Sequence, residues 1–311
     1  MAAIKVSNLT KFYGDFKAID SVSFSVKQGS VYGYLGPNGA GKTTTIRTML
    51  GLLKPNEGEV QIAGLNPIEH PVKCLQNVGY VPELPDLPPF YTGENLLGFT
   101  GKMFGLSQEV REEKVQNLLE VVGLEEHRSK KVGKYSKGMV QRLAVGLALI
   151  NDPSVLIMDE PTLGMDPGGA AHFRDLFTQL SGEGKTLFLS SHLLDEVQRL
   201  CTHVGVINWG EIRFKGTIEE LSETFTPNWV VEVELTEASP SIIDTLRNLD
   251  YVKNVTVKGK MLSLELREKK DWRSEISSEV FEQGGKIVSM NLRKASLEDA
   301  YLRAVGRGEQ K

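Results

Sequence analysis

Cysteine is scarce in this chain, and an excess of positive charge is missing. The 311 residues include only two cysteines, Cys74 and Cys201. Two isolated cysteines build no disulfide framework and suit a reducing compartment, so we expect each to be a small buried apolar residue. The formal net charge is −4 and the isoelectric point is about 5.9. This balance argues against a protein that binds nucleic acid without sequence preference, because such proteins carry a basic excess.

Long hydrophobic runs are also missing. The most apolar stretch, residues 143–150, lies between Arg142 and Asp152 and is far shorter than the roughly 20 residues of a membrane span. The N-terminus has no basic segment followed by an apolar one, so no signal peptide is expected. If the protein works at a membrane, another chain must supply the part that spans it. The composition, 40% hydrophobic and 24% charged, is that of a globular chain long enough for two cores.

The chain changes its pattern twice along its length. Residues 1–80 alternate as strands do around a glycine-rich loop, and residues 154–210 again alternate strands with helices. Two apolar runs there, residues 154–158 and 186–190, are typical of central strands in a parallel sheet. Between these regions a helical period follows a proline-rich loop. The pattern predicts an α/β core with a helical subdomain over about residues 84–150.

A new pattern begins near residue 225. Its expected elements are a strand, a helix, a hairpin of two strands, a helix and a strand, followed by a closing helix: residues 229–235, 241–249, 252–257, 261–266, 272–283, 286–292 and 296–305. The order β-α-β-β-α-β is that of the ferredoxin-like α+β arrangement. We therefore predict two domains, residues 1–224 and 225–311, with the boundary between Ser222 and Asn228.

A phosphate-binding loop is the most informative motif. Residues 36–43 fit the pattern G-x-x-x-x-G-K-[ST]. They lie between an apolar strand and a helix, which is the context that the motif requires. The glycines let backbone N–H groups approach phosphate oxygens, and the helix N-terminus adds its positive dipole end. Lys42 is expected to reach the β- and γ-phosphates and Thr43 to hold Mg²⁺. The predicted phosphate-binding residues are Gly36, Pro37, Asn38, Gly39, Ala40, Gly41, Lys42, Thr43 and Thr44.

Two carboxylates follow the strand at residues 155–158. Asp159 and Glu160 lie at its carboxyl end, where ligands bind in open α/β sheets. Together with a phosphate loop, this placement predicts that Asp159 positions Mg²⁺ and that Glu160 polarises the attacking water.

With these motifs in this order, residues 4 to about 220 resemble the nucleotide-binding subunit of an ATP-binding-cassette (ABC) transporter. The resemblance implies a P-loop NTPase core of the ABC type, with ATP and Mg²⁺ as ligands and ATP hydrolysis as the activity. The family's signature loop, usually Leu-Ser-Gly-Gly-Gln, corresponds to residues 135–139. Only Ser136 and Gly138 keep the pattern, and Lys137 adds a cation beside the expected phosphate.

Other family elements also match by position. Tyr13 stands where the family has an aromatic residue that stacks on adenine, and His192 resembles the histidine that contacts the γ-phosphate. Asp166 resembles the aspartate of the loop that crosses the dimer interface. Glu83 occupies the place of a glutamine, and its oxygen could still serve Mg²⁺. This departure, the variant signature loop and the C-terminal extension resemble the ABC-2 type exporters.

The resemblance further implies two partners. In the family, two ATP molecules are sandwiched between two chains, each site pairing the phosphate loop of one chain with the signature loop of the other. We therefore expect a second ATPase subunit, most simply a homodimer, and a permease of integral membrane subunits. The chain would be cytoplasmic and peripheral on the inner face of the cell membrane, and no nucleic-acid partner is expected.

Three alternatives remain at the level of the sequence. A DNA-maintenance ATPase of the same core carries a long coiled coil or a zinc-bearing insert, whereas residues 83–136 have neither long heptads nor a cysteine cluster. An ABC translation factor carries two cassettes in one chain, and this chain has one. Glu83 and the C-terminal domain argue against the third alternative, an ABC importer subunit, without deciding it. These motifs do not identify the cargo, the permease or the role of the C-terminal domain.

Overall fold

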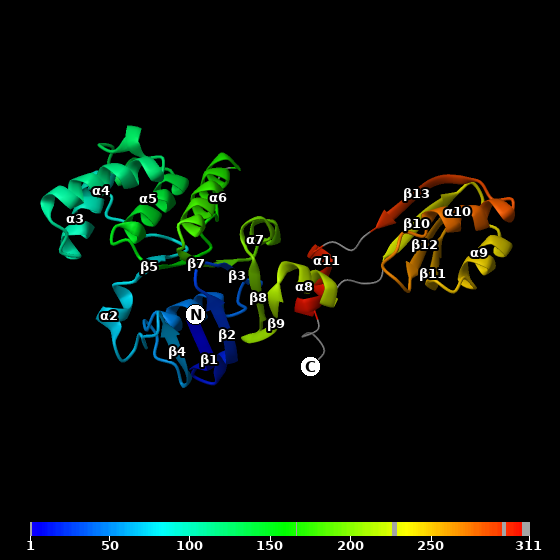
Figure 1. Cartoon of the computed structure of the whole chain (residues 1–311), viewed down its shortest axis with the longest axis horizontal. Coiled ribbons are helices and arrows are strands. Elements are labelled where there is room, and N and C mark those ends of the chain that lie inside the picture. Colours follow the sequence, from blue (N-terminus) through cyan, green and yellow to red (C-terminus); the bar gives the residue numbers. More distant parts are fainter. Residues whose placement is uncertain (1, 166, 226–228, 294–296, 307–311) are drawn as a thin grey trace. The chain divides into compact units, whose positions relative to one another are not determined.

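The computed structural model describes residues 2–165, 167–225, 229–293 and 297–306. Its packing forms two compact units, shown in Figure 1: one contains the chain up to Ile218 together with the end of the last helix from Val305, and the other contains residues 219–304. The predicted boundary falls on the end of α8 (Ile218–Phe225) and on residues 226–228, which lie outside the described residues. The predicted mixed α/β class, with a parallel sheet and a C-terminal antiparallel sheet, is confirmed.

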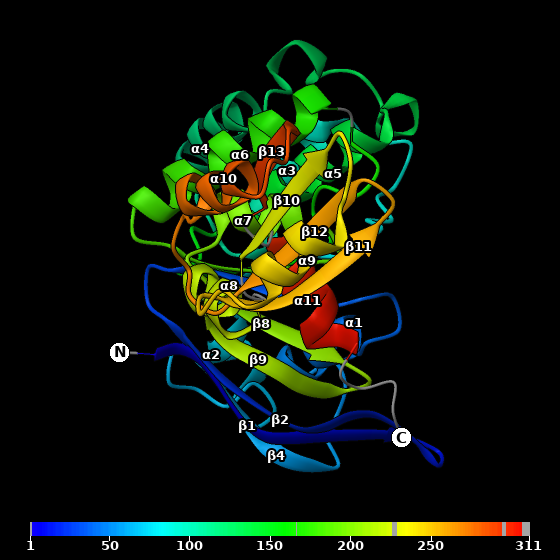
Figure 2. The same cartoon turned by 90° about the vertical axis from the view of Figure 1, so that its right-hand side faces the viewer.

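A three-stranded antiparallel sheet begins the first unit. Its order is β2 (Phe16–Lys27), β1 (Ala2–Tyr13) and β4 (Glu57–Ile62), which run side by side in Figure 2. Buried apolar residues recur along β1 and β2 because successive side chains of a strand point to opposite faces. Both strands lie in the region, residues 1–80, whose alternation predicted strands.

The second sheet of this unit leads into the phosphate loop after β3 and into the Asp159-Glu160 pair at the end of β6. Its order is β5-β6-β7-β3-β8-β9, with parallel neighbours from β5 to β8 and an antiparallel β9. The strands are β3 (Val31–Leu35), β5 (Val78–Val81), β6 (Val155–Asp159), β7 (Thr186–Ser191), β8 (His203–Asn208) and β9 (Glu211–Thr217). Every residue of β3, β6 and β7 is buried, as their continuous apolar runs predicted. The helices connected to this sheet are α1 (Lys42–Met49), α2 (Pro71–Leu75), α6 (Pro167–Gly182) and α7 (Leu194–Leu200).

Both cysteines are buried in this unit and free, as predicted. Burial raises the pKa of the Cys74 thiol and, more strongly, that of Cys201. Neither thiol therefore has thiolate character near neutral pH, and both act as packing residues.

The helical subdomain consists of α3 (Gly93–Met103), α4 (Gln108–Val121) and α5 (Lys137–Leu149), with short 3-10 turns at Glu125–His127 and Val132–Lys134. Each helix begins after a hydroxyl residue, Thr92, Ser107 or Ser136, whose side chain accepts a hydrogen bond from a backbone N–H of the first turn. The predicted helical region is therefore present, and its last helix begins directly after Ser136.

The second unit has the predicted element order. After most of α8, it contains β10 (Val230–Leu235), α9 (Pro240–Arg247), β11 (Val252–Lys258), β12 (Met261–Leu266), α10 (Arg273–Glu282), β13 (Ile287–Arg293) and, up to Ala304, α11 (Leu297–Gly306). The antiparallel sheet has the order β11-β12-β10-β13, so the first and third strands lie in the centre as in the split β-α-β-β-α-β arrangement. Val231, Val233 and Leu235 of β10 are fully buried in a core that includes Ile242 of α9 and Ile276 of α10. Across the described residues, none of the helices combines the length and hydropathy of a membrane span.

Candidate functional site

The phosphate loop joins β3 to α1, and it has no room for a side chain at Gly36 or Gly41. Gly41 precedes α1 with a φ of 105°, and a Cβ there would lie 2.7 Å from the carbonyl oxygen of Ala18. A Cβ on Gly36 would lie 2.4 Å from the carbonyl oxygen of Ile207. Packing therefore requires both glycines that the motif fixes, and Gly41 is required by its left-handed conformation as well.

Lys42 is the first residue of α1, and its ammonium group is held inside the loop. Its Nζ donates hydrogen bonds to the carbonyl oxygens of Gly36 at 2.7 Å and Pro37 at 3.3 Å. It also lies 3.1 Å from Glu160 Oε1, and the side chains of both residues are less than one-tenth exposed. The loop thus presents a buried cation whose partner in the structure is a carboxylate.

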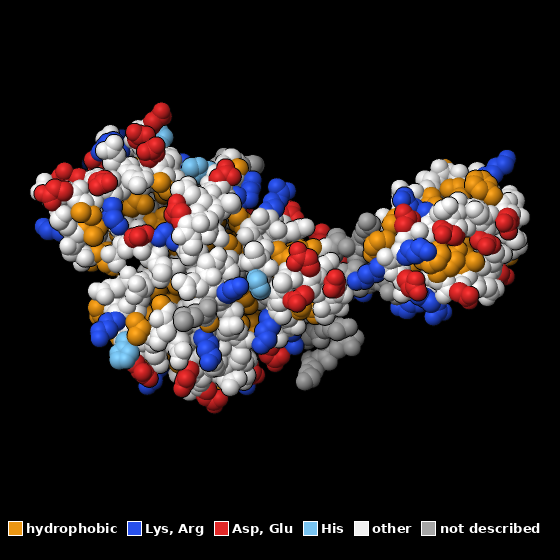
Figure 3. Space-filling view, in the orientation of Figure 1, with side chains coloured by type: hydrophobic (Ala, Val, Ile, Leu, Met, Phe, Trp, Pro, Cys, Tyr) orange, Lys and Arg blue, Asp and Glu red, His pale blue; other side chains and the backbone are white. Residues whose placement is uncertain are grey.

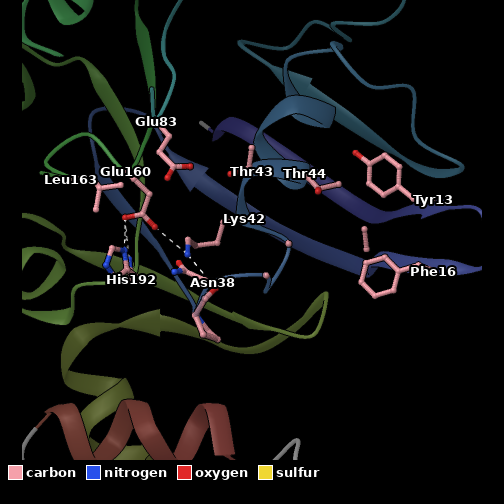
Figure 4. Close-up of a pocket in the computed structure, with 14 residues that line it drawn as sticks. Tyr13, Phe16, Asn38, Lys42, Thr43, Thr44, Glu83, Glu160, Leu163 and His192 are labelled. Atoms are coloured by element: carbon pink, nitrogen blue, oxygen red, sulfur yellow. Dashed lines mark hydrogen bonds and ion pairs between the residues drawn. The ribbon is translucent and has the colours of Figure 1, made fainter. Parts of the chain in front are cut away.

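The Glu160 carboxylate contacts both Lys42 and His192 (Figure 4). Glu160 follows β6 with a φ of 50°, a left-handed conformation that is uncommon for a residue with a Cβ. Its Oε2 accepts hydrogen bonds from the backbone N–H of His192 at 3.3 Å and lies 2.8 Å from His192 Nδ1. The carboxylate therefore lies between the predicted phosphate-binding lysine and the predicted histidine.

Asp159 is the last residue of β6 and is only 1% exposed. Its Oδ1 accepts a 2.6 Å hydrogen bond from the hydroxyl of Ser190 on β7. Burial and the charge of Asp159 raise the pKa of the nearby Tyr80 phenol, which keeps that ring neutral. Asp159 is thus a buried anion beside the cavity, with one oxygen already accepting a hydrogen bond.

A cavity of about 480 Å³ collects most of the predicted residues. It is lined by Tyr13, Phe16, Ala18, Pro37, Asn38, Gly39, Gly41, Lys42, Thr43, Thr44, Glu83, Glu160, Leu163 and His192. Of the predicted phosphate-binding residues, Gly36 and Ala40 lie behind the lining, and Gly36 contributes its carbonyl to Lys42. In Figure 4 the rings of Tyr13 and Phe16 lie at the opposite end from Glu160 and His192. The cavity has an aromatic end and a charged end, as a nucleotide requires.

Phe16, Ala18 and Leu163 line the cavity but were not predicted from the sequence. Phe16 is the cross-strand neighbour of Tyr13 in the β1–β2 hairpin, and the two rings are 60% and 48% exposed. The two-residue turn Gly14-Asp15 between alternating segments was the signal that could have paired them.

Phe16→Ala is expected to weaken nucleotide binding by about tenfold, because contact between a base and an aromatic ring is worth roughly 1–3 kcal/mol. Titration with a fluorescent ATP analogue measures the change. Phe281→Ala, which removes a ring of nearly equal exposure (61%) in the other unit, is the matched control and should leave the affinity unchanged. Equal affinities of Phe16→Ala and the wild type would remove Phe16 from the site.

Glu83 connects the cavity to the helical subdomain. It lies two residues after the end of β5 and lines the cavity with Thr43. The adjacent carbonyl of Pro82 accepts a 3.4 Å hydrogen bond from Gln141 Nε2, and Gln141 is a buried residue of α5. A displacement of α5 would therefore break or shift the hydrogen bond to Pro82, and it could move the neighbouring Glu83.

The signature-loop residues lie elsewhere in the same unit. Ser136 and Lys137 are exposed, Gly138 is half-buried, and none of the three lines the cavity. The Ser136 hydroxyl caps α5 by accepting from the N–H of Met139 at 3.3 Å. Asp166 lies outside the described residues. Ser136, Lys137 and Gly138 are therefore not part of the pocket formed by their own phosphate loop.

Two family models match the chain. The ABC transporter model matches residues 19–163, and the C-terminal domain model of ATP-binding protein DrrA1-3-like matches residues 216–305. The first match contains the phosphate loop, Glu83 and the Asp159-Glu160 pair, and the second ends within α11.

Known proteins resemble nearly the whole chain. It is 33% identical to the bacitracin transport ATP-binding protein BcrA of Bacillus licheniformis, over 98% of both chains. It is 37% identical to the Nod factor export ATP-binding protein I of Cupriavidus metallidurans, again over 98% of both.

A solved structure resembles the cassette itself. A dimeric ATP-binding cassette in a post-hydrolysis state with bound ADP and phosphate superimposes with a TM-score of 0.63 at 26% identity, covering 69% of this chain and 98% of that one. The match shows that much of this chain has the fold of an ATP-binding cassette. The chain belongs to the ATP-binding subunits of ABC transporters, in the exporter-type branch with a DrrA1-3-like C-terminal domain, and it is an ATPase coupled to transport.

Proposed function

We propose that this chain powers export through a separate membrane permease, as a homodimer that closes on ATP and opens after hydrolysis. The main support is the distribution of the site residues. Lys42, Glu160 and His192 face one cavity, whereas Ser136 and Lys137 are exposed outside it. A second chain is needed to bring a signature loop to each phosphate, so ligand binding would bias an open–closed equilibrium.

The chemistry is in-line attack of water on the γ-phosphate. Glu160 would orient the water and accept its proton, Lys42 would bind the β- and γ-phosphates, and His192 would contact the γ-phosphate. Tyr13 and Phe16 would bind the adenine at the other end of the cavity. Lys42 has to exchange Glu160 for phosphate oxygens when ATP binds, since the two side chains are paired in the structure.

Magnesium fits the side chains at this site. Thr43 and Glu83 line the cavity, and Asp159 lies at the adjoining end of β6, so the protein offers the oxygen ligands that Mg²⁺ prefers. Bound there with the nucleotide, the ion would neutralise charge that develops on the phosphates. We propose Thr43, Asp159 and Glu83 as its protein ligands, directly or through water.

Contact with the permease is proposed for the segment between Glu83 and the end of α3. Hydrophobic side chains are visible on the helical subdomain in Figure 3, and several large ones in this segment are strongly exposed. They are Leu84, Phe90, Phe99 and Met103, with exposed fractions of 76%, 66%, 60% and 73%. An apolar surface of this kind is typical of an interface. Through it the chain would be peripheral on the inner face of the cell membrane, while the permease chooses the cargo.

Mixing two inactive variants tests the shared site. Lys42→Met removes the phosphate-loop cation, and Ser136→Ala alters the signature loop, so each homodimer should hydrolyse ATP poorly. A mixed dimer contains one site with both Lys42 and Ser136 intact, and hydrolysis should therefore return on mixing. The control mixes Lys42→Met with Glu160→Gln, whose mixed dimer has no intact site and should stay inactive. If the first mixture is no more active than the second, the two-chain site is wrong.

A further inference from the structure

The parallel pairing of β6 and β7 brings an unassigned serine to the catalytic carboxylates. In this register Asp159 lies opposite Ser190, and the other pairs run down the strands to Val155 opposite Thr186. Ser190 is completely buried, and Asp159 is 1% exposed. The hydroxyl therefore has no access to water, and its hydrogen bonds must be satisfied by the protein.

The Ser190 hydroxyl joins two consecutive residues of the site. Its Oγ donates to Asp159 Oδ1 at 2.6 Å and accepts from the backbone N–H of Glu160 at 3.0 Å. The single hydroxyl proton is thus committed to the carboxylate, and a lone pair serves the amide. One side chain holds both the carboxylate expected at the metal and the backbone of the expected base.

The bond to the Glu160 amide lies where the backbone needs support. Glu160 adopts a φ of 50°, a sparsely populated conformation that persists only when neighbouring groups hold it. This turn carries its carboxylate to Lys42, at 3.1 Å, and to His192. A different backbone conformation at Glu160 would direct the carboxylate elsewhere.

The neighbouring serine serves a different element. Successive strand residues point to opposite faces, and the Ser191 hydroxyl accepts from the N–H of Leu193 at 2.9 Å and donates to Glu196 of α7. Ser191 therefore ties the start of α7 to the sheet, while Ser190 ties β7 to the acidic pair.

We propose that Ser190 is a positioning residue for hydrolysis: it orients the Asp159 carboxylate and keeps Glu160 in the conformation that reaches the attacking water. The proposal rests on the roles of Asp159 and Glu160 in the proposed function. Ser190 is fully buried and does not line the cavity, so it would act only through these two residues. It also explains why a polar side chain lies in the buried end of β7.

Hydroxyl deletions at the two ends of β7 test this role in the full-length chain. Ser190→Ala removes the bridging hydroxyl. Thr186→Val removes an equally buried hydroxyl, which accepts from the N–H of Gly29 at 3.0 Å far along the strand from Asp159. Steady-state hydrolysis, the Mg²⁺ concentration for half-maximal rate and the binding of a fluorescent ATP analogue in EDTA are measured for both. Ser190→Thr, which restores a hydroxyl, is the rescue variant.

Ser190→Ala should lower kcat by roughly 10–100-fold and raise the Mg²⁺ requirement, as loss of a group that orients a metal ligand does, with binding in EDTA unchanged. Thr186→Val should keep the wild-type kcat, and Ser190→Thr should recover most of the loss. A wild-type kcat for Ser190→Ala, or equal losses in Ser190→Ala and Thr186→Val, would overturn the proposal. Glu160→Gln in the same assay distinguishes failure of the proposed function from failure of the Ser190 proposal. If Glu160→Gln remains active, the proposed function fails. If Glu160→Gln is inactive and Ser190→Ala is fully active, only the role of Ser190 fails.

Discussion

Glu160→Gln is expected to lower ATP hydrolysis by at least about 100-fold and to tighten ATP binding. Removing a general base typically costs 10²–10⁴-fold in rate, and the amide cannot accept the proton of the attacking water. In the structure Lys42 pairs with the Glu160 carboxylate at 3.1 Å, so the native enzyme must break an ion pair to bind phosphate. The uncharged glutamine competes less, and since a hydrogen bond to a charged group is worth about 1.5–3 kcal/mol, we expect about tenfold tighter binding.

The measurements are steady-state phosphate release and titration with a fluorescent ATP analogue. Glu196→Gln is the matched control, because Glu196 is a neighbouring carboxylate whose partners, Thr162 and Ser191, are hydroxyl groups that can also donate to an amide oxygen. It should hydrolyse ATP at nearly the wild-type rate. Hydrolysis by Glu160→Gln at more than a tenth of the wild-type rate would contradict the role of Glu160.

Lys42→Met is expected to damage both binding and stability. The loss of hydrogen bonds to charged phosphate oxygens, each worth about 1.5–3 kcal/mol, should weaken ATP binding by about 100-fold or more. The variant also leaves the Glu160 carboxylate, 6% exposed, without its cation. Breaking a buried pair by removing one partner typically costs about 3–5 kcal/mol, so the free energy of unfolding of the first unit should fall by about 3 kcal/mol.

The double variant Lys42→Met/Glu160→Gln completes a thermodynamic cycle. It removes both charges, so its free energy of unfolding in urea should lie above that of Lys42→Met alone, although neither variant can bind ATP normally. A Lys42→Met chain as stable as the wild type would mean that the buried pair does not stabilise the fold.

Local motifs were predicted well because they depend on neighbouring residues. The phosphate loop and the strand that leads into the Asp159-Glu160 pair are each contained within about ten residues, and the structure has them at the predicted positions. The element order of the C-terminal unit was predicted equally well from local patterns such as that of β10, where Val231, Val233 and Leu235 alternate with polar residues. The role of each site residue remains a prediction until it is measured.

Features that depend on how strands pair were not predicted. Phe16 joins the cavity because the hairpin places it opposite Tyr13, a local pairing that the Gly14-Asp15 turn could have indicated. Ser190 meets Asp159 because β6 and β7, which are separated by a helix in the sequence, are neighbours in the sheet. Strand order and register are set by the packing of the whole core, and a local pattern does not contain them.

The rate of ATP hydrolysis per chain, measured across a wide range of wild-type protein concentrations, tests the two-chain site most directly. A site completed by Ser136 of a second chain predicts that turnover per chain rises with concentration and levels off once the dimer is populated, as sedimentation in the same buffer would show. A turnover per chain that is constant while the protein sediments as a monomer would contradict the account, because the cavity of one chain would then be sufficient for hydrolysis.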